Sequence, residues 1–227
     1  MDHAFSPLIA AAIAFVGSHF ALSHPLRAPL VKAAGDKGFA ALYSLVALAS
    51  FAWLVMAFRA APASAPLWDG QGAAVWIITS ALTLIAAVLF SGSFAGNPAM
   101  PDPRAAQLAA KGPHGVFHVT RHPMMWGFAL WAGAHALVSP TVRVLVLTAA
   151  IGFLALVGSH LQDRKKEAAM GAAWTGWEAK TSYWPMLGAL GHAGLRPWLI
   201  GAAIWLGATW GHIPLAYVPA GIWRWIG

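Results

Sequence analysis

Long runs of apolar residues, separated by short polar segments, dominate the hydrophobic pattern of this chain. Most of these runs approach the roughly 20 residues that an α-helix needs to cross a bilayer. They lie at residues 8–22, 39–58, 73–94, 124–138, 142–161 and 195–212. The fourth run is the shortest, so we expect it to gain a turn at Pro123 or to pack inside the bundle. The pattern predicts an all-α, polytopic membrane helix bundle of about six transmembrane helices, forming a single integral-membrane domain over residues 1–227.

Turn-forming residues and charges refine the boundaries of these helices. Residues 35–38 (GDKG) predict a turn before the second helix. The lysine-rich residues 163–167 are expected to continue the fifth helix into the aqueous interface. Residues 215–225 are broken by proline, which favours an interfacial cap over a further crossing.

Composition supports a membrane protein and sets its orientation. The chain is 59% hydrophobic and 9% charged, whereas a soluble domain carries about 25% charged residues. Three alternate connections hold 11 of the 14 lysines and arginines. This positive-inside pattern predicts that both termini face the periplasm of a bacterial inner membrane. The net charge of +7 is therefore explained by residues that orient the protein in the lipid bilayer, and no nucleic-acid partner is expected.

Candidate chemistry centres on histidines, because the chain contains no cysteine. Disulfides, iron–sulfur clusters and covalent haem attachment are thus excluded. Given the predicted topology, His19 lies just over one turn above the inner end of the first helix. His122 and His160 lie at the inner ends of the fourth and fifth. His135 lies inside the fourth apolar run, about 18 Å above its inner end.

Histidines inside apolar segments need a partner, a cavity or a cofactor. Two histidines from different helices can form a b-type haem site, and an interhelical hydrogen bond is the structural alternative. No acidic residue lies well inside an apolar run. A proton relay of buried carboxylates and a carboxylate-bridged metal pair are therefore not expected.

Several stretches, taken together, resemble the NnrU family of membrane proteins, which is distantly similar to the plant 15-cis-ζ-carotene isomerase. They are GSHFALSHPLR, LYSLVALASF, HVTRHPMMWGFALWAGAH, DRKK and KTSYWP. The resemblance implies an inner-membrane protein associated with denitrification, the reduction of nitrite and nitric oxide. It also implies haem b with His19 and His135 as axial ligands, and His122 and His160 complete the candidate cofactor-binding set. The isomerase has a cysteine where this chain has Ala132, so a thiolate ligand is excluded.

Three alternatives remain open on the sequence alone. The first is a haem-dependent isomerase of the carotenoid type. The second is a methyltransferase that uses S-adenosylmethionine, since RHPMMWG resembles a segment of integral-membrane methyltransferases. In those enzymes acidic residues after the next helix help to bind S-adenosylmethionine, and Glu167, with Arg164, lies at a comparable place in this chain. The third is a non-enzymatic assembly partner in which the histidines are structural. A lipophilic small molecule or nitric oxide is the expected ligand of the haem-binding forms.

Overall fold

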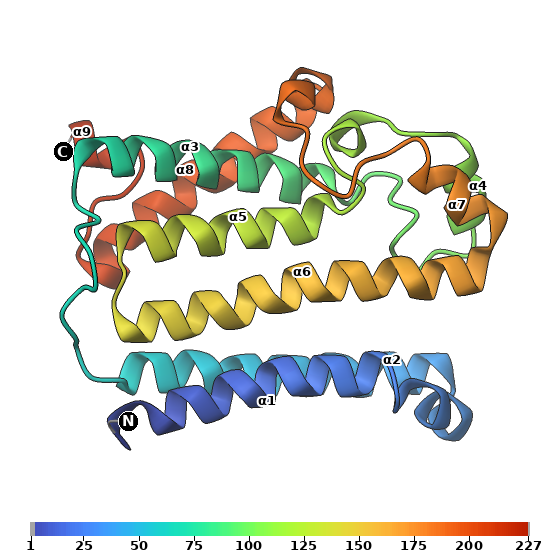
Figure 1. The fold of residues 1–227 in the computed structure, drawn as a ribbon, viewed down its shortest axis with the longest axis horizontal. Helices are drawn as coiled ribbons and strands as arrows, with labels where there is room; N and C mark the ends of the chain where they lie inside the picture. Colours follow the sequence, from blue (N-terminus) through green and yellow to red (C-terminus); the bar gives the residue numbers. More distant parts are fainter. Residues whose placement is uncertain (1–2, 227) are drawn as a thin grey trace.

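The computed structural model describes residues 3–226, and helices make up most of this part of the chain (Figure 1). The long helices are α1 (Ser6–Ser23), α2 (Arg27–Ala60), α3 (Ala73–Gly92), α5 (Pro123–Val138), α6 (Val142–Met170) and α8 (Leu195–Ala216). The short ones are η1 (His3–Phe5), α4 (Ala105–Ala110), η2 (Gly115–His118), α7 (Ala172–Glu178), η3 (Leu187–Ala193) and α9 (Trp223–Ile226). Within residues 3–226 there is no strand, so the predicted all-α class is confirmed.

The predicted apolar runs fall on the long helices. Within the described residues, five helices are long and apolar enough to cross a membrane: α1 together with η1, α2, α3, α6 and α8. The sixth, α5, has only 16 residues and packs between α3 and α6 (Figure 1). The expectation that this short helix lies inside the bundle is confirmed, because neighbouring helices cover two of its sides.

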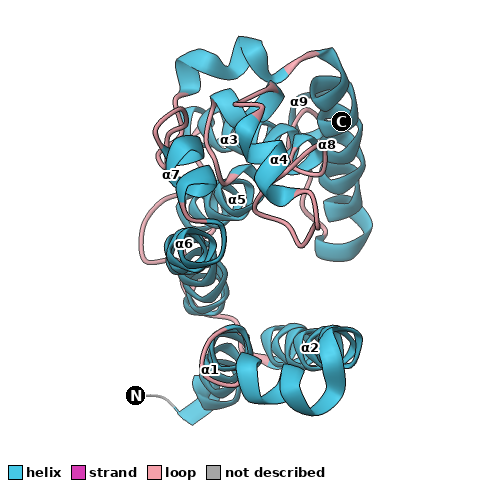
Figure 2. Ribbon diagram, turned by 90° about the vertical axis from the view of Figure 1, so that its right-hand side faces the viewer, coloured by secondary structure: helices cyan, strands magenta, loops and turns pink. Residues whose placement is uncertain are grey.

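The long helix α6 separates the molecule into two packed parts (Figure 2). On one side lies the α1–α2 hairpin, whose core with α6 includes Leu8, Leu54 and Ala150. On the other side α5 packs on α6, α3 packs on α5, and α8 packs on α3. A second core forms there around Val88 of α3 and Trp126 of α5.

Local sequence signals explain the helix boundaries that shape the site. Pro123 opens α5, where its missing N–H costs nothing. The turn predicted at residues 35–38 is a kink within α2, at Gly35 with φ of 71°. The helix α6 continues past its apolar part to Met170, as the lysine-rich segment predicted, and Gly171 ends it with φ of 53°. Only glycine adopts such an angle without steric cost.

The first and last described helices, η1 and α9, lie at the same end of the bundle (Figure 1). This arrangement fits an even number of crossings. Residues 1–2 and 227, the two ends predicted to be periplasmic, lie outside the described residues, and the orientation of the bundle stays a prediction.

Candidate functional site

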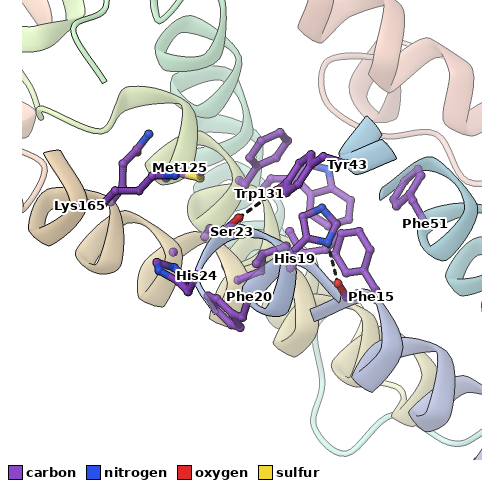
Figure 3. A pocket seen from close by; sticks show the side chains of 16 residues that line it. Phe15, His19, Phe20, Ser23, His24, Tyr43, Phe51, Met125, Trp131 and Lys165 are labelled. Atoms are coloured by element: carbon purple, nitrogen blue, oxygen red, sulfur yellow. Dashed lines mark hydrogen bonds between the residues drawn. The ribbon is translucent and has the colours of Figure 1, made fainter. Parts of the chain in front are cut away.

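A pocket of about 670 Å³ lies between the α1–α2 hairpin and the α5–α6 pair (Figure 3). We call it the hairpin pocket. Its walls are mostly apolar and aromatic, and its size is typical of small-molecule and cofactor sites. The lining residues are Phe15, His19, Phe20, Ser23, His24, Tyr43, Phe51, Met125, Phe128, Trp131, Ile151, Leu154, Ala155, Gly158, Gln162 and Lys165.

The imidazole of His19 is oriented by its own helix. Its Nδ1 lies 2.6 Å from the carbonyl oxygen of Phe15, one turn earlier in α1. A carbonyl only accepts hydrogen bonds, so Nδ1 carries the hydrogen and the neutral ring keeps a lone pair on Nε2. The rings of Phe15 and Tyr43 pack edge-on against His19, at centroid distances of 4.5 and 5.8 Å. The histidine is thus held as a potential metal ligand with a fixed tautomer.

The hairpin pocket is basic where it meets the inner ends of α1 and α6. His24, in the connection between α1 and α2, and Lys165 of α6 both line it there. Partial burial and the nearby Lys165 ammonium lower the pKa of His24, so this imidazole is neutral at pH 7. One end of the pocket therefore offers a positive charge and a hydrogen-bonding ring, while the rest is apolar.

A second pocket, of about 630 Å³, lies between α3, α5, α6 and α8. We call it the His135 pocket, because His135 and His212 both line it. Phe128 and Trp131 of α5 line both pockets and so form a shared wall. Since His19 lines only the hairpin pocket and His135 only the other, the structure does not bring the two predicted axial ligands into one cavity.

The predicted residue His122 lies in a buried ionic cluster that the sequence analysis did not foresee. His122 is 3% exposed, and its Nε2 donates to Oδ1 of Asp163 over 2.7 Å. Arg121 donates through Nε and Nη2 to the other oxygen of Asp163, at 2.9 and 2.7 Å. Asp163 itself is 6% exposed. We call these three residues the Asp163 cluster.

The Asp163 cluster joins three segments that are distant in the sequence. Arg121 also reaches Glu178 of α7 at 3.3 Å, and its backbone N–H donates to the carbonyl of Ser182. The Arg121 guanidinium lies over the ring of Tyr183, 5.5 Å from its centre. Partial burial and the nearby Asp163 carboxylate raise the pKa of Glu178. The cluster therefore ties the start of α5 to α6 and to the segment after α7.

The remaining predicted residues lie away from both pockets. His160 is exposed on α6 and lines neither pocket. His122 uses its Nε2 within the cluster, so neither histidine is placed to touch a ligand in these cavities. Arg121 and His122 of the methyltransferase-like segment are engaged by Asp163, and Glu167 and Arg164 are exposed. Within residues 3–226, no group of three or more histidine, aspartate or glutamate side chains is arranged to hold a metal ion.

The fold defines a polytopic helical membrane protein with two internal pockets. The family model of the NnrU protein matches residues 7–220, nearly the whole chain. The chain belongs to the NnrU family, as its sequence stretches indicated. No curated protein and no solved structure matches the chain.

Proposed function

We propose that this NnrU-family protein binds haem b in the hairpin pocket, with His19 as an axial ligand, and that it serves denitrification in the bacterial inner membrane. The observation that carries the proposal is the Nε2 lone pair of His19 in an apolar pocket with a basic end. Haem matches this pocket, since its apolar ring suits the apolar walls and its two anionic propionates suit the basic end.

The residues of the pocket fit each part of the group. His19 would hold the iron through Nε2, with the Phe15 carbonyl fixing the imidazole. Lys165, with neutral His24 beside it, would receive a propionate. The aromatic side chains of Phe51 and Trp131 would exclude water from the ring faces. When bound, haem supplies an iron centre that takes up nitric oxide or exchanges electrons.

The resemblance implies His135 as the second axial ligand. In the present arrangement Trp131 stands between it and the hairpin pocket, with its ring 4.1 Å from that of His135. Ligation by both histidines would therefore need Trp131 to move. With His19 as the one protein ligand, the iron would be able to take up a small ligand such as nitric oxide.

An absorption spectrum tests haem binding directly. The protein is expressed with added haem, purified in detergent and measured before and after dithionite. We expect a Soret band that falls at least tenfold in His19→Phe, because the only proposed iron ligand of this pocket is lost. His114→Phe is the control, since His114 donates to the carbonyl of Ala95 far from the pocket.

The same spectra separate the two ligand sets. Low-spin bands that disappear in His135→Phe would support ligation by both histidines, and unchanged spectra would support His19 alone. A wild-type protein without visible absorption after haem supplementation would overturn haem binding. Equal haem content in His19→Phe and the wild type would overturn this pocket as its site.

Complementation tests the role in denitrification. A strain that lacks this chain is supplied with the wild type or with His19→Phe, and its reduction of nitrite and nitric oxide is followed. We expect the wild type to restore reduction and His19→Phe to fail while still reaching the membrane. Full restoration by His19→Phe would favour the assembly-partner alternative, in which the histidines are structural.

A further inference from the structure

We propose that the His135 pocket binds a lipophilic quinol or phenol whose ring hydroxyl shares its single hydrogen between the imidazoles of His135 and His212. The proposal concerns the cavity beside the hairpin pocket, and it rests on the form of the proposed function in which His19 alone would hold the haem iron, because ligation by His135 would use the same Nε2. It rests on which polar atoms face this cavity and on how the protein already uses each of them.

Both histidines present a hydrogen-bond acceptor. Nδ1 of His135 lies 2.8 Å from the carbonyl oxygen of Trp131, and Nδ1 of His212 lies 2.8 Å from that of Ala208. Each Nδ1 must therefore carry the hydrogen, because a carbonyl cannot donate. In its neutral form, each ring therefore keeps a lone pair on Nε2. The two rings stack with centroids 5.9 Å apart.

Two threonine hydroxyls of the pocket wall are also acceptors toward a ligand. Thr79 donates to the carbonyl of Val75 at 2.9 Å, and Thr148 donates to that of Val144 at 2.8 Å. Their single hydrogens are thus used within their own helices, and only oxygen lone pairs remain. A ligand that carries an O–H donor can use these acceptors, whereas one with only carbonyl or ether oxygens cannot; the lining also holds donors at Ser80, Ser139 and Arg143.

One donor of the pocket wall also lacks a partner. Trp76 lines the pocket and is 6% exposed, and its Nε1 is buried without a hydrogen-bond partner within the described residues. An unpaired buried donor is costly, and a ligand oxygen would satisfy it. A hydroxyl group suits this combination, because its one hydrogen can be shared between the two imidazole acceptors while its oxygen accepts from the indole.

The rest of the pocket suits an aromatic ring with an apolar tail. Phe90, Phe128, Trp131 and Trp205 provide aromatic walls. Helices α3, α6 and α8, which border the pocket, are all long and apolar enough to lie in the bilayer. A ligand would therefore reach the pocket from the lipid phase, where quinols and long-chain phenols are dissolved.

Binding of decylubiquinol to the full chain in lipid nanodiscs tests the proposal, by calorimetry against empty nanodiscs. We expect saturable binding that becomes roughly tenfold weaker in His135→Phe and in His212→Phe, since each loses one acceptor. His212 lies near the end of α8 and is only partly buried, so its variant keeps the test open if His135→Phe does not fold. His114→Phe, which lines neither pocket, is the matched control and should bind like the wild type.

A chemical control tests whether the hydroxyl is recognised. The dimethyl ether of decylubiquinol keeps the ring and tail but has no O–H, and we expect it to bind at least tenfold more weakly. Equal binding of quinol and ether would overturn the proposal. So would a wild-type signal no larger than that of empty nanodiscs, or an equal loss in His114→Phe and His135→Phe. Haem content measured on the same samples keeps the two sites distinguishable.

Discussion

Replacing Asp163 by asparagine is expected to lower the free energy of unfolding by about 3–5 kcal/mol, the range found when one partner of a buried ion pair is removed. The Asp163 side chain is 8% exposed and the Arg121 side chain 14%. Asparagine has nearly the same shape but no charge. It would leave Arg121 with only the longer contact to Glu178, and it would remove the carboxylate that accepts from His122.

Thermal unfolding in detergent, followed by tryptophan fluorescence, measures this loss, and we expect the midpoint to fall by on the order of 10 °C. The chain offers a matched control in the exposed pair of Arg104 and Asp102. Arg104 also binds its aspartate through Nε and Nη2, but its side chain is 71% exposed. Asp102→Asn should therefore lower the midpoint far less than Asp163→Asn does. Equal effects of the two substitutions would show that burial of the Asp163 cluster adds nothing to the stability of the protein.

The helices could be predicted from the sequence because a bilayer imposes one strong rule. A chain in hydrocarbon must satisfy its backbone hydrogen bonds internally, so a long apolar run becomes a helix. Pro123 and Gly171 then mark helix ends through backbone geometry alone. The lysine-rich residues 163–167 continue α6 because charges cost little at its aqueous end. Each of these signals is local, and the predictions made from Pro123 and from residues 163–167 were confirmed.

The neighbours of each helix were harder to predict, because apolar runs give depth in the membrane but not the direction a side chain faces. His19 and His135 were both correctly placed on helices, α1 and α5. The hairpin of α1 and α2 packs on α6, however, and Trp131 separates the two histidines. Small residues such as Ala132 and Ala150 make contacts on α5 and α6 that hydrophobicity does not distinguish. Hydrophobicity along a single sequence therefore does not show which face of each helix packs against which neighbouring helix.

The Asp163 cluster was missed for a different reason. Asp163 follows an apolar run and precedes Arg164, so the sequence suggested an aspartate exposed at the aqueous end of a helix. One signal was available. Arg121 and His122 open the fourth helix on the same side of the membrane where Asp163 ends the apolar part of the fifth. Consecutive helices are usually neighbours, so opposite charges at one level predict an ion pair.

A methyl group added at Gly201 is expected to destabilise the protein by about 1–3 kcal/mol, because it would force α8 away from α3. The Cβ of Gly201→Ala would lie 2.7 Å from both Cα and N of Val88, and a backbone cannot rotate away as a side chain does. Close approach of helices at small residues is a common basis of packing within membranes. Ser91 adds a polar contact at the same interface by donating to the carbonyl of Pro197 at 3.0 Å.

Gly207 on the same helix gives the control, since a Cβ there meets nothing within 4 Å. Alanine favours the helix over glycine by up to about 1 kcal/mol at both positions, so the difference between Gly201→Ala and Gly207→Ala isolates the clash. The two variants are compared by thermal unfolding, and equal midpoints would contradict the close contact.

The effect of Gly201→Ala should reach the His135 pocket, because α8 carries His212 and Trp205. The Nε1 of Trp205 donates to Thr83 of α3 over 3.0 Å. Moving α8 outward would break that bond and widen the pocket, so Gly201→Ala should weaken quinol binding while leaving the hairpin pocket, which α8 does not line, unchanged.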